Sequence, residues 1–338
     1  MTGTPPSAGA GPATAAEMSP ARRAEPGSTA LRLIRENGLI AVVIVWGAYL
    51  ALATDSFLTR ANILLVLRQS SSIGIVAIGA ALVILLGHID LSLGSILAVS
   101  GVVGAQLLLS TGAPVVLAVI ATIALGALCG VANGISVTVL RINSFMATLG
   151  MMSVLEGAAY VRTSGRTLFG DRLGHLTFLS NGYIAGIPFP VIVLFLAYAL
   201  AWVLLNRTTF GARLYAVGNN SRASYLAGIR VEVVTVAAFA LAGALAGFGG
   251  LLQVSRLNSA GGGMGADLLF PVITAVVLGG ISLSGGKGRV LDVLVASIFL
   301  GMIANGLILL GVSGYTQEIV SGAILIAALA LDRWRVAR

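Results

Sequence analysis

The chain has 338 residues, of which 57% are hydrophobic and 9% are charged. Soluble domains carry roughly 25% charged residues, so this composition excludes a water-soluble domain, a disordered chain and a nucleic-acid-binding module. The 20 basic and 12 acidic residues give a net charge of +8. Most of the basic residues lie in short segments between apolar stretches, which is typical of the cytoplasmic flanks of membrane spans. The sequence predicts an all-α, polytopic membrane protein.

The N-terminal segment is rich in Ala, Pro, Gly, Ser and Thr and has no apolar periodicity. We expect residues 1–35 to form a flexible cytoplasmic tail and residues 36–338 to form a single transmembrane domain. The first apolar stretch begins near residue 38, which is too late for the hydrophobic core of a secretory signal peptide. It is therefore interpreted as a retained span.

A helix of roughly 20 apolar residues crosses a bilayer core of about 30 Å, and on this criterion the sequence predicts ten spans. The span at 268–282 is short, and the span at 113–139 is long enough to tilt or break. The full set is 38–54, 70–87, 94–110, 113–139, 144–162, 188–206, 233–252, 268–282, 290–311 and 316–332.

The basic residues predict the orientation of these spans. With the N-terminus inside, 14 basic residues fall in the inner segments and 5 in the outer ones. The positive-inside rule then predicts that both termini are cytoplasmic. It also leaves a long outer loop at 163–187 and a long inner loop at 207–232.

Glycines recur every fourth residue in two expected spans, at Gly126, Gly130 and Gly134 and at Gly243 and Gly247. Small residues let helix backbones approach closely in lipid, where no hydrophobic force drives helices together. This spacing predicts tight helix packing, mostly within the chain.

His88, Asp90 and Ser92 lie in a polar segment between two apolar stretches. Polar breaks between helices often frame solute sites in transporters, and intramembrane charge usually faces a cavity. The alternative is that Asp90 caps the helix that follows it. We predict either a solute path or a structural cap. A metal site is not expected, because His88 has no cysteine or second histidine beside it.

A second glycine-rich segment contains Gly285, Gly286, Lys287 and Gly288. It does not match a phosphate-binding loop, because Ile281 stands where the leading glycine belongs and Gly288 replaces the Ser or Thr that would hold magnesium. We predict a tight cytoplasmic turn between two helices, with no nucleotide site and no cofactor in this chain.

The inner loop contains a predicted short helix within residues 218–229. Asn220 or Ser221 is a suitable N-cap, and Gly228 is a suitable C-terminal stop. Such a helix either docks onto a cytosolic partner or lies idle at the membrane surface.

Glu156 lies inside the expected fifth span, where it either lines a path or pairs with Arg162. A secondary transporter would share the hydropathy of this chain but would need a titratable coupling group, for which Asp90 and Glu156 are the candidates. An intramembrane enzyme is the least favoured class, because the sequence has no convergent nucleophile, paired carboxylates or metal-binding set.

Three ordered motifs resemble the permease subunits of ATP-binding-cassette (ABC) importers for monosaccharides of the ribose and xylose type, over about residues 56–331. The motifs are Ile89-Asp90-Leu91-Ser92-Leu93-Gly94-Ser95, Ala216-Val217-Gly218-Asn219-Asn220 and residues 276–288, extended by Asn305-Gly306-Leu307. The resemblance implies about ten helices and a permease that pairs with a second copy or a paralogue in the cell membrane. It also implies a cytosolic ATPase subunit that uses the ATP and an extracytoplasmic solute-binding protein.

The resemblance further implies that the inner-loop helix couples the permease to the ATPase. The residues of this coupling loop would be Gly218, Asn219, Asn220, Ser221, Arg222, Ala223 and Gly228. The side chains expected along the substrate path are His88, Asp90, Ser92, Glu156, Gln253 and Asn305.

Overall fold

The computed structural model describes residues 3 and 26–336. In this part of the chain, seven helices are long and apolar enough to cross a membrane, which confirms an all-α, multi-pass membrane protein. They are α2 (Arg60–Leu85), α3 (Leu93–Gln106, continued by a π-helical turn over Leu107–Thr111), α4 (Val115–Thr138), α5 (Ser144–Thr163), α7 (Phe189–Arg207), α10 (Val231–Leu257) and α12 (Val290–Leu309).

Three shorter apolar stretches of helix accompany these seven. They belong to α1 (Pro26–Ala53), to α11 (Leu269–Leu278, preceded by a 3₁₀ turn over Ala266–Leu268) and to α13 (Gly314–Val336). They coincide with the expected spans at 38–54, 268–282 and 316–332, so a total of ten crossings stays a prediction. Helix α1 begins within the expected tail, and residues 4–25 of that tail lie outside the described part of the chain.

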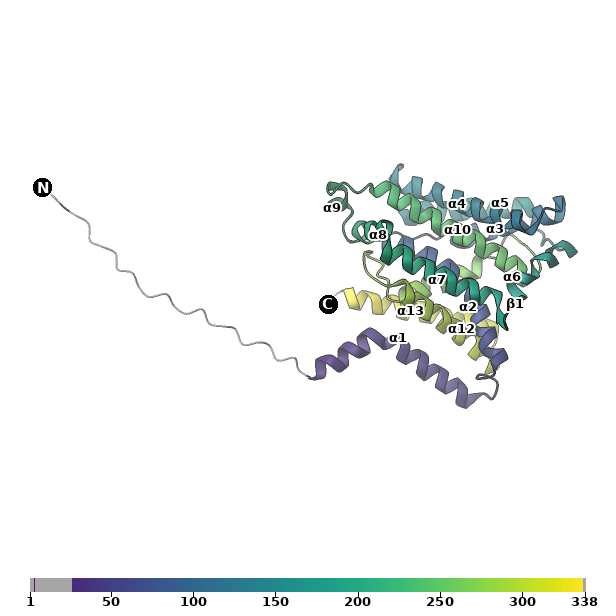
Figure 1. Ribbon diagram of the computed structural model, residues 1–338, viewed down its shortest axis with the longest axis horizontal. Coiled ribbons are helices and arrows are strands. Elements are labelled where there is room, and N and C mark those ends of the chain that lie inside the picture. The colour runs from purple at the N-terminus through teal and green to yellow at the C-terminus, as the bar shows by residue number, and fades with distance from the viewer. Residues whose placement is uncertain (1–2, 4–25, 337–338) are drawn as a thin grey trace.

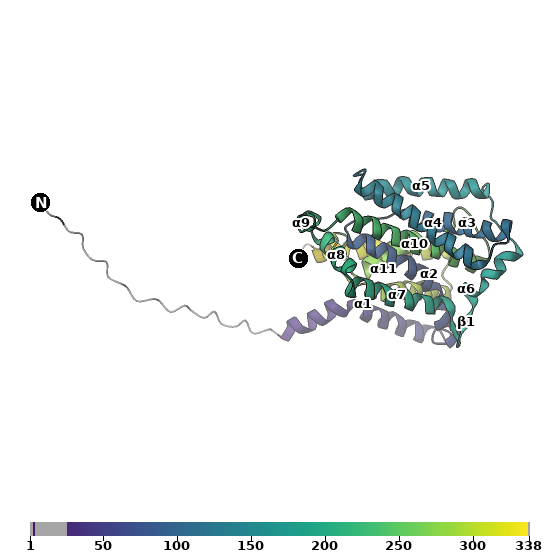
Figure 2. The ribbon, with the colours of Figure 1, turned by 45° about the horizontal axis from the view of Figure 1, so that its top comes forward.

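The centre of the bundle is formed by α2 and α10. Helix α10 packs against α2, α3 and α4, and α2 also packs against α7, α11 and α12. Figures 1 and 2 show α4 and α5 along one edge of the bundle and α1 along the opposite edge, with α10 and α2 between them.

The expected close packing between glycine-rich helices occurs between α4 and α10. A Cβ atom at Gly126 would strike the backbone of Gly243 and Gly247, and one at Gly130 would strike the carbonyl of Phe239. The two glycine series therefore face each other within the chain, as their spacing predicts.

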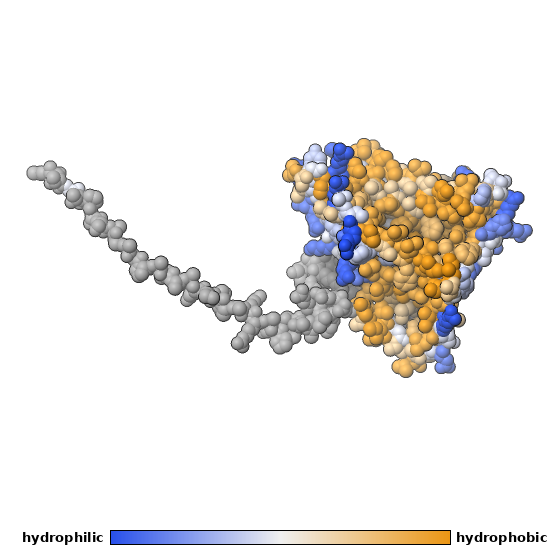
Figure 3. Space-filling model, in the orientation of Figure 1, coloured by the Kyte–Doolittle hydropathy of each residue, from blue (hydrophilic) through white to orange (hydrophobic). Residues whose placement is uncertain are grey.

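The surface has an apolar middle and two polar ends. Figure 3 shows apolar side chains covering the bundle between the ends of its helices. Large side chains such as Val116, Leu128 and Val154 are 66–68% exposed there, as lipid contact requires. The start of α1 and the end of α13 lie at the same end of the bundle (Figure 1).

The two long loops contain more structure than the sequence indicates. The inner loop forms two helices, α8 (Thr209–Asn219) and α9 (Ser221–Leu226), at the end of the bundle where α13 finishes. At the opposite end, the outer loop forms a 3₁₀ helix (Asp171–Leu176) and α6 (Thr177–Asn181). An antiparallel hairpin of β1 (Tyr183–Ile184) and β2 (Ile187–Pro188) follows.

One expectation about an individual span is wrong, and one of two alternatives for another span is excluded. The second span was expected from residue 70, but α2 begins at Arg60, where the Thr59 hydroxyl caps it by accepting from the Asn62 N–H at 3.3 Å. Arg68 interrupts the apolar stretch but lies within the continuous helix α2, and its guanidinium bonds Asn181 and Tyr183 at 2.9 and 2.6 Å. The long span at 113–139 forms one unbroken helix, α4.

Candidate functional site

Three segments that are far apart in the sequence meet at the end of the bundle that contains α8 and α9. They are the last residue of α2, Leu85, with the α2–α3 connection that follows it (residues 86–92), the end of α8, and the turn between α11 and α12 (residues 279–289). The Gly286 N–H donates to the Leu85 carbonyl at 2.8 Å, and the Asn219 Nδ2 donates to the Gly286 carbonyl at 3.3 Å. We call this meeting point the three-segment junction.

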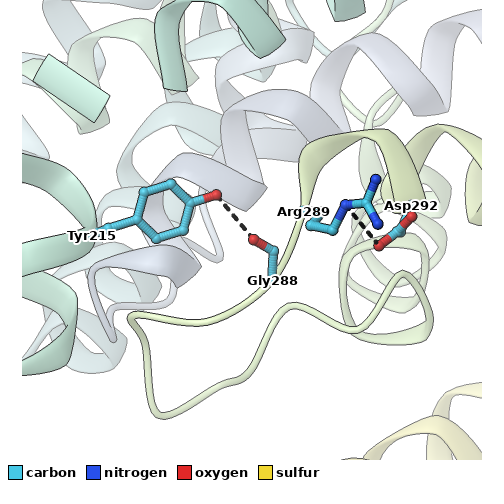
Figure 4. Close-up of polar contacts among 4 residues, drawn as sticks. All are labelled: Tyr215, Gly288, Arg289 and Asp292. Atoms are coloured by element: carbon cyan, nitrogen blue, oxygen red, sulfur yellow. Dashed lines mark hydrogen bonds and ion pairs between the residues drawn. The ribbon is translucent and has the colours of Figure 1, made fainter. Parts of the chain in front are cut away.

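Tyr215 reinforces the junction from α8. Its hydroxyl donates to the Gly288 carbonyl at 2.9 Å (Figure 4). Burial raises the pKa of the Tyr215 hydroxyl, so the group stays protonated and donates at neutral pH. Arg289, next in the turn, forms an ion pair of 3.9 Å with Asp292 that is largely exposed and therefore contributes little.

Backbones touch directly at the junction, with no side chain between them. A Cβ atom on Gly218 would overlap the Leu85 carbonyl oxygen, and one on Gly285 would come within 2.7 Å of the Gly87 nitrogen. Gly285 also has a φ of +83°, a conformation that residues with a Cβ rarely adopt. The glycines are therefore needed for close backbone contact.

The glycine-rich turn satisfies its own backbone groups. The Gly285 N–H donates to the Ser282 carbonyl and the Ser282 N–H donates to the Lys287 carbonyl, both at 3.0 Å. Because the Gly286 N–H is bonded to Leu85, these amides do not form the open cradle of N–H groups that binds phosphate. The glycine-rich segment thus forms a turn between α11 and α12, and its cytoplasmic position stays a prediction.

Asp90 lies in the α2–α3 connection, outside the membrane-length helices, and is 3% exposed. Its Oδ1 accepts from the Ser92 N–H at 2.9 Å and from the Ser92 hydroxyl at 2.6 Å. Its Oδ2 accepts from Asn133 Nδ2 on α4 at 3.3 Å. Burial raises the pKa of the Asp90 carboxyl, and these hydrogen bonds oppose the rise. Ser92, not Asp90, occupies the N-cap position of α3, and Asp90 holds that residue in place.

Side chains of α5 hold the same connection from another side. The Leu91 N–H donates to Thr148 Oγ1 at 3.1 Å, and the Ile89 N–H donates to Ser144 Oγ at 3.4 Å. The Thr148 hydroxyl also lies 3.3 Å from the Ile89 carbonyl. The backbone N–H groups of Ile89 and Leu91 are thus satisfied by α5, while Asn133 of α4 bonds the side chains of Asp90 and Ser92.

The six side chains expected along the substrate path do not form one pocket. The His88 ring lies against Phe239 of α10, with ring centroids 6.1 Å apart. Gln253 lies on the same helix, about 20 Å from Phe239 at a rise of 1.5 Å per residue. Its buried Oε1 has no partner among the described residues. Asn305 exchanges two side-chain hydrogen bonds with Asn62 of α2.

Glu156 is half-buried on α5, and the expected pair with Arg162 is not formed. Six residues correspond to about 240° around a helix, so the two side chains leave α5 on different faces. Arg162 instead exchanges hydrogen bonds with Gln106 of α3, at 2.9 Å through its Nε and at 2.7 Å through its carbonyl.

Helix α9 begins and ends where the sequence predicts. The Asn220 side chain accepts from the Ala223 N–H at 2.9 Å, which makes Asn220 the N-cap. Gly228 follows the helix with a φ of +82°. Tyr225 and Leu226 are 62% and 74% exposed at this polar end.

Sequence reasoning does not identify three residues that hold this site together: Asn133, Thr148 and Tyr215. Asn133 is detectable in principle, as a single amide in the glycine-spaced stretch of α4. The contacts of Thr148 and Tyr215 join segments more than 50 residues apart, and no local pattern indicates them. Among the residues that the structure describes, no group of three or more His, Cys, Asp or Glu side chains could hold a metal ion.

Comparison with known proteins places these features in a family context. Residues 62–329 match the family model described as branched-chain amino acid transport system / permease component. The chain is 41% identical to the ribose import permease protein of Bacillus subtilis, over 88% of this chain and 91% of that protein. It is 38% identical to the ribose import permease protein of Escherichia coli K12, over 89% and 94% of the two chains. It is 34% identical to the L-arabinose ABC transporter permease protein of Azospirillum brasilense, over 90% and 89%. No solved structure matches the chain.

Proposed function

The chain belongs to the branched-chain amino acid transport system permease family, and within it to the permeases of sugar ABC importers, and from this premise we propose that it translocates a ribose-like monosaccharide. The membrane is the bacterial cell membrane, and a separate cytosolic ATPase supplies the energy. We propose ribose over arabinose because the sequence identity to the ribose permeases, 41% and 38%, exceeds the 34% identity to the arabinose permease.

The three-segment junction beside α9 is the observation that best supports ATPase coupling. Helix α9 is short, capped and exposed, and it presents Tyr225 and Leu226 to the solvent. It follows α8 directly, and α8 contacts both Leu85, the last residue of α2, and the glycine-rich turn. A partner that displaces α9 would therefore act, through α8, on the end of α2 and on the turn between α11 and α12.

The opposite end of the bundle is the proposed docking face for an extracytoplasmic solute-binding protein. Phe169, Phe178, Tyr183 and Ile184 are 47–70% exposed there. This assignment places the α8–α9 end in the cytoplasm, where the excess of basic residues predicts it to be.

A second copy, or a paralogue, is proposed to cover α5 and α13. Helix α5 exposes Ser153 and Gly157 and half-exposes Glu156, and α13 exposes Glu318 and Ser321. Polar groups facing lipid are costly, so these two faces fit a protein partner and a hydrated path better than the bilayer.

Vesicle transport tests this function. The chain is purified from its native membrane in mild detergent with the proteins that remain bound, and the assembly is reconstituted with ATP on the α8–α9 side. A solute-binding protein and labelled ribose, arabinose or galactose are added on the other side. We expect ribose uptake that requires ATP and the binding protein. Uptake that continues without ATP and follows a proton gradient would contradict the proposal and favour a secondary transporter.

A further inference from the structure

The α2–α3 connection (residues 86–92) directly follows Leu85, which contacts the coupling segment, and is itself bonded to two membrane helices, α4 and α5. This position gives it a role that the family assignment does not specify. The inference rests on the proposed function, because it concerns how the ATPase drives transport.

On the first side, Leu85, the residue before the connection, packs closely against the backbone of α8. Gly218, the second-last residue of α8, lies against the Leu85 carbonyl so closely that a Cβ atom would overlap it. Gly286 bonds the same residue, Leu85, through its N–H at 2.8 Å, and Gly87 lies against Ser284. Backbone contacts of this kind have no flexible side chain that could absorb a displacement.

On the second side, hydrogen bonds fix the connection to α5. The Leu91 N–H donates to Thr148 Oγ1 at 3.1 Å, and the Thr148 hydroxyl lies 3.3 Å from the Ile89 carbonyl. Asp90 and Asn133 add an attachment to α4. A movement of residues 89–91 would therefore move the cytoplasmic end of α5.

Helix α5 is the membrane-length helix best placed to respond. It is the least buried of the seven in the described chain, and it packs on α3 and α4. Its exposed face bears the half-buried Glu156 and lies on the side that we assign to the second copy and the solute path.

We propose that residues 86–92 form a mechanical relay that carries displacement of α8 and α9 to α5. Gly218 is the positioning residue at the input of this relay, and Thr148 is the positioning residue at its output. Neither residue touches the sugar. Their expected effect is on the number of sugars moved per ATP hydrolysed, not on sugar affinity.

The experiment measures ATP hydrolysis and sugar uptake together in vesicles that contain the full complex. Thr148→Val preserves the shape of the side chain but removes the hydroxyl. We expect it to lower the uptake-to-hydrolysis ratio about fivefold, as for one lost hydrogen bond, with the KM for sugar unchanged. The matched control is Thr163→Val on the same helix, because the Thr163 hydroxyl bonds only its own helix, at Ala159 and Tyr160.

A second pair of variants tests the input end. Gly218→Ala should lower the same ratio, while Gly38→Ala in α1 should not, because a Cβ atom at Gly38 meets no neighbouring atom within 4 Å. Thr148→Ser retains the hydroxyl and should restore most of the ratio lost in Thr148→Val.

Three outcomes would overturn the relay. The first is a ratio in Thr148→Val equal to that in Thr163→Val. The second is a Thr148→Ser variant as uncoupled as Thr148→Val, and the third is a change in KM alone. Absence of ATP-dependent uptake by the wild-type complex is a different result. It would overturn the proposed function, and the relay with it.

Discussion

Asn62 of α2 and Asn305 of α12 bind each other through two buried side-chain hydrogen bonds of 2.8 and 3.0 Å. Asn62 also donates to the Phe57 carbonyl at 3.0 Å. The two amides therefore join α2 to α12 through bonds that occupy the groups a sugar would need, although the sequence alone suggests a place for Asn305 along the substrate path.

Asn305→Ala is expected to lower the stability of the protein by about 1–2 kcal/mol, because it leaves the Asn62 amide buried without its partner. Asn62→Ala should cost a similar amount, and the double variant should cost less than the sum of the two. Thermal unfolding in detergent measures this cycle, alongside the KM for uptake. A KM that rises in Asn305→Ala but not in Asn62→Ala would return Asn305 to the substrate path.

Gly130→Ala should destabilise the bundle by about 1–3 kcal/mol, because the added methyl group must push α4 away from α10. A Cβ atom there meets the Phe239 carbonyl and the Ala240 Cα. The matched variant Gly38→Ala lies in α1, where nothing stands within 4 Å, and should be neutral or slightly stabilising through helix propensity. Equal melting temperatures for the two variants would contradict the close packing of α4 and α10.

Exchanging Asp90 and Asn133 tests the buried carboxylate. Asp90→Asn places an amide donor among three donors and should cost about 1–3 kcal/mol. Asn133→Asp places a second carboxylate beside Asp90 and should cost more, because like charges repel at this distance. The double variant restores one acid and one amide, so it should recover most of the lost folded protein. Recovery is measured as monodisperse yield by size-exclusion chromatography, and a double variant no better than either single one would refute the pairing.

Tyr215→Phe should loosen the three-segment junction by removing the hydrogen bond to Gly288, at a cost of about 1 kcal/mol. The readout is limited trypsin digestion, because Lys287 and Arg289 lie in the glycine-rich turn. We expect faster cleavage at that turn in Tyr215→Phe and unchanged cleavage in Tyr225→Phe, whose side chain is 62% exposed. Identical cleavage rates in the two variants would show that Tyr215 does not restrain the turn.

The sequence predicts the helices of this protein well because lipid forces each spanning segment to satisfy its backbone internally. All ten expected spans coincide with apolar helices. The start of α2 is missed for a physical reason. Arg68 makes residues 60–69 resemble a loop, but its guanidinium remains charged and donates hydrogen bonds to Asn181 and Tyr183, more than 100 residues away.

The site is predicted in its parts but not in its assembly. The motifs around Asp90, Gly218 and Gly286 are visible in the sequence, since polar and glycine-rich segments are unusual among apolar helices. That they touch one another depends on the packing of α2, α8 and α11, which no local pattern encodes. Sequence reasoning therefore selects Asp90 but misses Asn133, the residue on which Asp90 depends.

The backbone contact between α4 and α10 has a consequence for how the bundle changes shape. At Gly126 and Gly243 the two helices meet without side chains that could switch rotamers, so they have one way of fitting together. During alternating access they should move as a rigid body. Inward-facing and outward-facing structures would then superpose on these two helices, which form a fixed frame against which the mobile helices can be measured.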